Sequence, residues 1–256
     1  MENRLSSSAT HKTNLLQLRL AQIERDHSPA VFAASFGAED MVLLHLIATQ
    51  FKGIGLFTLD TGRLPRETLE LIDRVESTYG IAVTRFSPVS AQVDSYVAMF
   101  GRDGFYDSVA NRKSCCQIRK VEPLQRALTG TRAWLTGLRR EQAPSRAAMV
   151  EIEFDATHGI VKFNPLIEWT NDEVWSFLRA HAVPTNPLHD RGYPSIGCEP
   201  CTRAVRPGDD TRAGRWWWES DAEKKECGLH VARSDVKPAA IQIAPAPLPT
   251  IEKATP

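Results

Sequence analysis

Five cysteines supply the thiols with which this 256-residue chain could bind a metal or attack a substrate. Their positions are Cys115, Cys116, Cys198, Cys201 and Cys227. The first four fall into two close pairs, and four clustered thiolates are common ligands of a metal ion or an iron–sulfur cluster. The fifth stands apart. The spacing therefore predicts one ligand set and one separate, potentially reactive thiol.

The two cysteine pairs leave more than one kind of site open. A structural zinc site typically uses two Cys-x₂₋₄-Cys knuckles, and only Cys198-Glu199-Pro200-Cys201 forms one. Iron–sulfur clusters also take four thiolates and tolerate varied spacing, so the adjacent pair Cys115-Cys116 modestly favours a cluster over zinc. Four purely structural thiols are the third alternative.

Cys227 lies among charged residues. Lys224, Lys225 and His230 are within three positions of it, and nearby cations lower the pKa of a thiol and favour the nucleophilic thiolate. Glu226 acts in the opposite direction. Because a lone cysteine is more often incidental than catalytic, this context alone assigns Cys227 no role.

The arginines form two groups. One comprises Arg139, Arg140 and Arg146, and the other comprises Arg203, Arg206, Arg212 and Arg215. Isolated arginines are usually solvated surface charges, but arginines gathered at strand ends and beside cysteines suit bidentate capture of phosphate or sulfate oxygens. The adjoining run at residues 216–218 consists of three tryptophans, which either pack in the core or form a lid.

Strand-like and helix-like segments alternate along the chain. Strands are expected at residues 30–34, 54–59, 82–86 and 132–138, helices at 15–23, 41–47, 65–80 and 170–178, and a hairpin or two edge strands at 149–154 and 159–163. The pattern weakens over residues 91–105. This alternation predicts an α/β fold with a mostly parallel twisted sheet and helices on both faces. Ligands of such sheets bind beyond the carboxyl ends of the strands, where the turns at residues 35–40 and 60–63 would lie.

Composition limits the function classes. Lysine plus arginine and aspartate plus glutamate both number 31, which argues against a nucleic-acid-binding face and a polybasic membrane anchor. We expect a cytoplasmic protein because no apolar run suits a signal peptide or a membrane span. In that reducing compartment the cysteines are ligands or reactive thiols, not disulfides.

Several motifs together resemble one enzyme family. They are Cys115-Cys116, Cys198-Glu199-Pro200-Cys201, Glu226-Cys227-Gly228-Leu229-His230, residues 35–40, Leu59-Asp60-Thr61-Gly62-Arg63 and Thr136-Gly137-Leu138-Arg139-Arg140-Glu141-Gln142. Over about residues 15–235 the chain resembles the assimilatory adenosine 5′-phosphosulfate (APS) reductases of bacteria. The resemblance implies an adenine-nucleotide α-hydrolase-like fold and a [4Fe–4S] cluster on Cys115, Cys116, Cys198 and Cys201.

The resemblance also implies a mechanism. Cys227 would be the nucleophile that attacks the sulfonyl sulfur of APS, so that AMP leaves and an enzyme S-sulfocysteine forms. Thioredoxin or a glutaredoxin-like dithiol would then release sulfite for cysteine biosynthesis. The implied substrate-binding residues are Ser35, Phe36, Gly37, Asp40, Thr61, Gly62, Lys120, Gly137, Arg139, Arg212, Arg215 and His230. Among them Lys120 would lie between cluster and substrate, and the three arginines would bind the phosphosulfate. The turn at residues 35–40 departs from the Ser-Gly-Gly-x-Asp-Ser loop of ATP-cleaving relatives, which fits an enzyme that need not bind pyrophosphate.

The expected organisation has four parts. Residues 1–13 are expected to form a flexible N-terminal tail, and residues 14–205 the nucleotide- and cluster-binding catalytic domain. Residues 206–236 would form a mobile catalytic tail that carries Cys227, and the Pro- and Ala-rich residues 237–256 a disordered end. The sequence leaves the oligomeric state open, a homo-oligomer included.

Three alternatives compete with APS reduction. The first is reduction of 3′-phosphoadenosine 5′-phosphosulfate (PAPS), alone or beside APS, although enzymes restricted to PAPS resemble this chain without its four cluster cysteines. The second is an ATP-dependent RNA-thiolation enzyme, which predicts ATP cleavage and tRNA affinity that the balanced charge and the altered turn do not. The third is a zinc-stabilised binding module, which predicts zinc and no iron.

Overall fold

The structure is a computed structural model and describes residues 7–219 and Leu229. Its centre is a six-stranded sheet in the order β3-β2-β1-β4-β6-β5. The strands are β1 (Ala30–Ala33), β2 (Ile54–Leu59), β3 (Thr84–Phe86), β4 (Ala133–Leu135), β5 (Ile152–Asp155) and β6 (Ile160–Phe163). All neighbours pair in parallel except β5, which forms an antiparallel hairpin with β6. The expected α/β class and hairpin are confirmed.

Strands β2, β1 and β4 form the middle of the sheet. Ala30 in β1 pairs with Ile54 in β2 on one side and with Ala133 in β4 on the other. This register aligns the carboxyl ends of the three strands at one edge of the sheet. The chain leaves β1 toward β2 in one direction and reaches β4 on the opposite side, which creates the crevice where ligands of such sheets bind.

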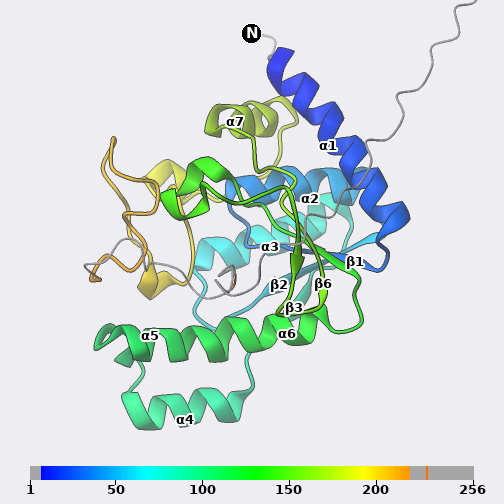
Figure 1. Ribbon diagram of the computed structural model, residues 1–256. Coiled ribbons are helices and arrows are strands. Elements are labelled where there is room, and N and C mark those ends of the chain that lie inside the picture. Colours follow the sequence, from blue (N-terminus) through cyan, green and yellow to red (C-terminus); the bar gives the residue numbers. More distant parts are fainter. Residues whose placement is uncertain (1–6, 220–228, 230–256) are drawn as a thin grey trace, which may run out of the picture.

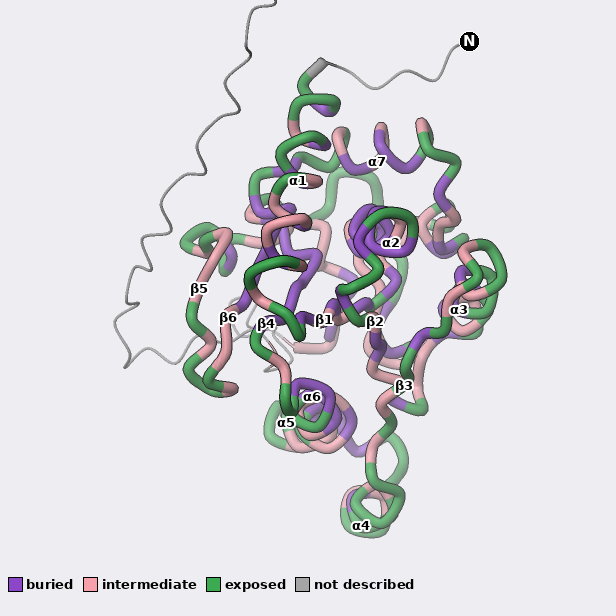
Figure 2. The backbone as a smooth tube through the Cα atoms, turned by 90° about the vertical axis from the view of Figure 1, so that its right-hand side faces the viewer, coloured by how far each residue is buried: buried purple, intermediate pink, exposed green. Residues whose placement is uncertain are grey.

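Helices cover both faces of the sheet (Figures 1 and 2). One face carries α1 (Ser7–Asp26), α2 (Ala38–Gln50), α3 (Arg66–Tyr79) and α7 (Asn171–Ala180), and the other carries α5 (Val109–Cys116) and α6 (Glu122–Leu128), with α4 (Ser90–Phe100) beyond them. The larger core lies under the first group and the smaller one, built on Phe57, Leu124 and Trp134, under α6. Two apolar layers thus enclose the sheet, as parallel strands require.

The N-terminal segment differs from expectation because α1 begins at Ser7, within the segment expected to be a loose tail. Ala9 and Thr13 are buried, and Lys12 donates to Glu173 of α7 over 2.7 Å. Packing against α7 therefore orders a stretch whose own sequence is polar. None of the helices in the described part of the chain has the length and apolar character needed to cross a membrane.

Helix α4 was not expected, since its residues show no clear helical stripe. Tyr96 is its only buried residue, so a pattern of inward-facing apolar side chains is not needed there. Next along the chain, α5 starts from Ser108, whose hydroxyl accepts a hydrogen bond from the Asn111 amide. A π-helical turn, Gln117–Val121, then joins α5 to α6, and such turns are frequent at functional sites.

Candidate active site

A cavity of about 190 Å³ opens at the carboxyl ends of β1, β2 and β4. The turns that follow these strands supply much of its wall. Eight of the expected substrate-binding residues line it, namely Ser35, Gly37, Asp40, Thr61, Lys120, Gly137, Arg212 and Arg215. The turns after β1 and β2 lie at this edge of the sheet, as the order of strands and turns in the sequence predicts.

The turn after β1 leads into the start of α2 at the cavity wall. Gly37 precedes the first residue of that helix and lines the cavity. A helix N-terminus presents unpaired N–H groups and favours an anion. Phe36 has φ 63° and is fully buried in the core. A bulky residue in the left-handed region is strained, and such strain concentrates at functional sites.

Asp40 lies between this turn and the turn after β4. Its carboxylate accepts a hydrogen bond from the Ser35 hydroxyl over 2.6 Å and another from the Ser35 amide. A Cβ atom at Gly137 would lie 2.1 Å from Asp40 Oδ1, so only glycine fits there. Burial raises the pKa of Asp40 to about 6, although the hydrogen bonds from Ser35 lower it. Asp40 is thus a buried carboxyl that is bonded to Ser35 and packs closely against the Gly137 backbone.

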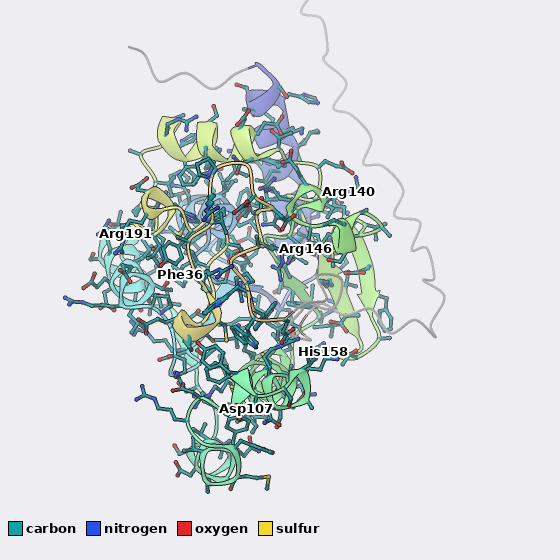
Figure 3. All side chains as sticks on the ribbon, turned by 90° about the vertical axis from the view of Figure 1, so that its left-hand side faces the viewer. Phe36, Asp107, Arg140, Arg146, His158 and Arg191 are labelled. Carbon is teal, nitrogen blue, oxygen red and sulfur yellow. The ribbon has the colours of Figure 1, made fainter. Side chains whose placement is uncertain are left out.

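Arg139 and Arg146 have different surroundings. Arg139 is 3 % exposed and donates to Glu39 over 2.8 Å, to Glu141 over 2.7 Å and to the Trp169 carbonyl. It does not belong to the cavity lining, whereas Arg146 does. Arg139 is therefore engaged by carboxylates beside the cavity, and its role as a phosphosulfate ligand remains a prediction. Figure 3 labels Arg146 and Phe36, both near the middle of the face in view.

Three residues separate this cavity from a second, smaller one. Lys120, Arg215 and Trp216 line both. Lys120 lies in the π-helical turn that follows Cys115 and Cys116, so the local geometry after α5 carries its side chain to this boundary. A cationic boundary between two cavities can act on a ligand in either of them.

The four paired cysteines line the second cavity. Cys115 and Cys116 come from the end of α5, and Cys198 and Cys201 from a short turn after α7. The Thr61 hydroxyl lies 3.3 Å from Cys198 Sγ and hydrogen-bonds to it. Two sequence-distant pairs are therefore brought together next to a turn that also lines the first cavity.

The pKa values of two of these thiols are shifted in opposite directions. Burial would raise the pKa of Cys198, but Lys120, the Thr61 hydroxyl and Arg215 hold it below its usual value. Burial and the neighbouring Cys198 instead raise the pKa of Cys201 to about 12. Buried thiolates this close repel each other, and a bound metal removes that penalty because it ligates the deprotonated form.

The arrangement of the thiols bears on the choice between zinc and a cluster. A single tetrahedral zinc ion would hold its sulfurs about 3.8 Å apart, since each Zn–S bond is about 2.3 Å long. Within residues 7–219 and Leu229, no group of three or more His, Cys, Asp or Glu side chains is arranged to hold a metal ion. Four cysteines that share one cavity have the type and number of donors that either one zinc ion or an iron–sulfur cluster takes.

Other expected site residues lie outside the cavity lining or outside the described chain. Gly62 adopts φ 66° beside the Arg119 guanidinium. Cys227 and His230 fall outside the described residues. Leu229, two positions after Cys227, is described, lines the first cavity and packs against the core cluster that contains Trp134.

Several residues that line the two cavities are not among the substrate-binding residues expected from the sequence. Arg119 donates to the Thr61 carbonyl over 2.7 Å and lines the cysteine cavity, and Glu39, Gln142 and Arg146 line the first cavity. Arg146 stood out only as one of a cluster of three arginines. Side-chain pairing selects which arginine of that cluster faces the cavity, and chain order does not show it.

The mostly parallel α/β sheet, with a cavity at the carboxyl ends of its strands, is a fold of the adenine-nucleotide α-hydrolase-like class. The pattern of the phosphoadenosine phosphosulfate reductase domain matches residues 29–204. The chain belongs to this family, which confirms the resemblance that its motifs indicate.

Curated relatives resemble the chain over most of its length. The adenosine 5′-phosphosulfate reductase of Burkholderia cepacia is 56 % identical over 227 residues, which cover 89 % of this chain and 90 % of that protein. The enzyme of the same name from Allochromatium vinosum is 56 % identical over 211 residues, or 82 % of each chain. That of Neisseria meningitidis serogroup A is 50 % identical over 231 residues, which cover 90 % of this chain and 94 % of that protein.

Solved structures agree on the fold. The phosphoadenylyl-sulfate (PAPS) reductase of Candida auris, in a phosphate complex, is 28 % identical with a TM-score of 0.62 over 79 % of this chain and 98 % of that one. The FMN adenylyltransferase of Candida glabrata, in complex with FAD and pyrophosphate, is 16 % identical with a TM-score of 0.55. The match covers 86 % of this chain and 78 % of that one. At that identity the likeness shows the fold alone.

Proposed function

We propose that this protein reduces APS to sulfite and AMP, through an S-sulfocysteine on Cys227 and at the expense of a dithiol protein such as thioredoxin or a glutaredoxin. The observation that carries the proposal is a cavity lined by Lys120, Arg146, Arg212 and Arg215, next to a second cavity lined by four cysteines. Curated relatives that are half or more identical to the chain bear the name APS reductase.

The cations have a clear task in this reaction. A thiolate that approaches a phosphosulfate brings two anions together, so cations must offset the repulsion and stabilise the AMP that leaves. Arg146, Arg212 and Arg215 present guanidinium groups that suit bidentate contacts to such oxygens. The turn at residues 35–40, at the start of α2, supports the nucleotide.

The proposed chemistry balances in two steps. The Cys227 thiolate attacks the sulfonyl sulfur, an S–S bond forms, and the S–O bond to the phosphate breaks with its electrons going to AMP. A thiolate of the dithiol protein then attacks Cys227 Sγ and expels sulfite, and its second thiol resolves the mixed disulfide. Two electrons pass from the dithiol to sulfur. Leu229, which follows Cys227 by two positions in the sequence, lines the cavity.

The four paired cysteines fit a [4Fe–4S] cluster by type, number and shared cavity. When bound, the cluster would supply positive metal charge to the thiolates and link α5 to the turn of Cys198 and Cys201. Lys120, on the boundary between the cavities, lies where it can act on both the cluster and an anionic substrate. The electrons of the proposed reaction come from the dithiol.

The preferred substrate is APS and not PAPS. Relatives named APS reductases share 50–56 % of their residues with the chain, whereas the structure named PAPS reductase shares 28 %. The reaction belongs to assimilatory sulfate reduction in the cytoplasm, where thioredoxin-type dithiols stay reduced.

One experiment tests reaction and residue together. The protein is purified without oxygen and incubated with APS in the absence of a dithiol, and the peptide that contains Cys227 is analysed by mass spectrometry. We expect one sulfonate on Cys227 and one equivalent of released AMP. Cys227→Ser should form neither, while its iron content and AMP affinity stay at the wild-type level.

Two results would contradict the proposal. A stable S-sulfonated product from Cys227→Ser would place the nucleophile elsewhere. A parallel incubation with PAPS decides the substrate, because a tenfold or greater advantage of PAPS in kcat/KM, about 1.4 kcal/mol in transition-state free energy, would replace APS.

A further inference from the structure

A buried ion pair joins the cysteine-bearing helix to the last continuous stretch of the described chain. Arg112 in α5 is 0 % exposed, and the Glu219 side chain is 4 % exposed. Arg112 Nε donates to one carboxylate oxygen over 2.7 Å and a terminal nitrogen of the guanidinium donates to the other over 3.0 Å. Such a bidentate pair fixes both partners in angle as well as in distance.

The pair lies against the residues that divide the two cavities. The Arg112 guanidinium is 4.7 Å from the centre of the Trp216 ring, and those of Arg215 and Arg212 are 4.8 Å and 5.8 Å from it. Arg212, Arg215 and Trp216 all line the first cavity, and we call them the cationic wall. The Glu219 amide donates to the Trp216 carbonyl over 2.9 Å, so the carboxylate and the wall belong to one turn.

The backbone of this turn is strained at Trp216, so neighbouring residues must hold the turn in place. Trp216 has φ 43° and is 1 % exposed, and a bulky residue keeps that conformation only where its surroundings impose it. Its amide donates to the Cys201 carbonyl over 3.2 Å. The Cys201 backbone therefore holds one end of the turn, and Arg112 holds the other end through Glu219.

We propose that Arg112 and Glu219 are positioning residues that hold the cationic wall in place and couple it to the helix of Cys115 and Cys116. This role rests on the proposed function, because it takes the wall to bind the phosphate and sulfonate oxygens of the substrate. Neither residue lines the first cavity, so both act through the wall.

Loss of the carboxylate charge has a definite consequence. The Arg112 cation would stay buried beside Trp216 and Cys116 without its bidentate partner, and a buried charge that loses its partner is strongly unfavourable. Residues 216–219 would then move to admit water or another anion, and the wall would move with them. The turns at residues 35–40 and 136–137 would hold the rest of the ligand and should stay in place, because the Ser35–Asp40 hydrogen bonds and the close packing of Asp40 on Gly137 do not involve residues 216–219.

Binding of AMP and of adenosine to Glu219→Gln tests the proposal by calorimetry. AMP carries an anion for the wall and adenosine does not. We expect AMP to bind about tenfold more weakly, as the loss of one charge-assisted contact predicts, and adenosine to bind as in wild type. The kcat/KM for APS should fall roughly 10- to 100-fold through misplacement of the wall, with the iron content unchanged.

Two further variants sharpen the result. Glu219→Asp keeps the negative charge and should recover most of the AMP affinity, and it decides the question if Glu219→Gln does not fold. Glu151→Gln breaks the Arg19–Glu151 pair, away from both cavities, and should leave AMP affinity within about twofold of wild type, as loss of a partly exposed pair predicts.

The outcomes separate this inference from the proposed function. If wild type binds AMP but Glu219→Gln binds AMP equally well, or loses AMP and adenosine affinity in parallel, the positioning role is wrong. A loss of iron in Glu219→Gln would also overturn it, because the pair would then be structural. If wild type fails to reduce APS, the proposed function fails, while the comparison of AMP with adenosine still tests the positioning role.

Discussion

Among single residues, Asp40 shows that the site contains a buried carboxyl group, whose charged form is disfavoured by burial. Its carboxyl group is enclosed by the Ser35 amide and hydroxyl and by the Gly137 backbone. Burial raises its pKa to about 6 from an ordinary value of 3.8, so the folded protein binds a proton there more tightly than the unfolded chain does. The geometry of the cavity is kept at a cost in stability at neutral pH.

The sign of the resulting pH dependence follows by linkage. The contribution of Asp40 to stability is fully present below pH 4 and is lost as the pH rises through 6. Relative to Asp40→Asn, which cannot ionise, the wild-type free energy of unfolding should fall by about 3 kcal/mol over this range. Urea unfolding of both proteins between pH 4 and 7 measures the difference. Asp94→Asn, at an exposed carboxyl in α4, is the control, and a constant difference between wild type and Asp40→Asn would contradict the prediction.

At the scale of elements, the start of α7 anchors two distant parts of the chain. The Thr170 hydroxyl accepts from the Glu173 amide, and the Glu173 carboxylate accepts from the Thr170 amide and from Lys12 of α1. Partial burial would raise the pKa of Glu173, but the hydrogen bonds from Lys12 and Thr170 hold it at about 2. Next to this cap, the Asn171 amide donates to Glu141, which also pairs with Arg139. The cap thus supports the turn after β4.

Thr170→Ala should cost about 1 kcal/mol of unfolding free energy, because it removes the acceptor for one N–H group of the first turn of α7. Chemical denaturation at pH 7 measures this change. The matched control is Thr157→Ala, which alters an exposed threonine in the turn between β5 and β6 and should have almost no effect. Equal stabilities of the two variants would show that the cap contributes nothing measurable.

At the scale of the whole molecule, the cysteine cavity ties together segments from both halves of the sequence. Tyr106 donates to the Pro200 carbonyl over 2.7 Å, and the Glu199 amide donates to the Arg63 carbonyl over 2.8 Å. These bonds bring the Cys198–Cys201 turn against the short turn Gly104–Tyr106, which precedes α5, and against the turn after β2. A cluster bound by the four thiols would add a covalent link across the same contact.

Removal of one ligand should therefore affect the whole fold. Cys201→Ser, purified without oxygen, is expected to lose most of its iron and visible absorbance, and its Tm should fall by about 5 °C or more, because a group bound only by the native state stabilises it. Metal analysis, absorption spectra and thermal unfolding measure these changes, with Cys227→Ser as the control that keeps the iron. One zinc per chain and no iron in wild type would rule out the cluster.

Much of the fold could be predicted from the chain itself. Buried strands such as β1 and β2 appear as short apolar runs, and amphipathic helices such as α3 and α7 as apolar residues at helical spacing, because these patterns arise between near neighbours. Helix α4 could not be predicted in this way, because Tyr96 is its only buried residue and its sequence shows no apolar stripe. Helix α1 starts at Ser7 because its first turns pack on α7, which no local pattern encodes.

For the site, the residue types can be read from the chain: two cysteine pairs, a lone thiol, two arginine groups and turns at strand ends. Which of these residues lie together depends on how the chain folds. Arg146 lines the cavity while Arg139 is paired with Glu39, and Arg112 joins Glu219 across the molecule. The physical reason is that side-chain chemistry is carried by each residue alone, whereas burial and charge pairing depend on neighbours that are distant in the chain.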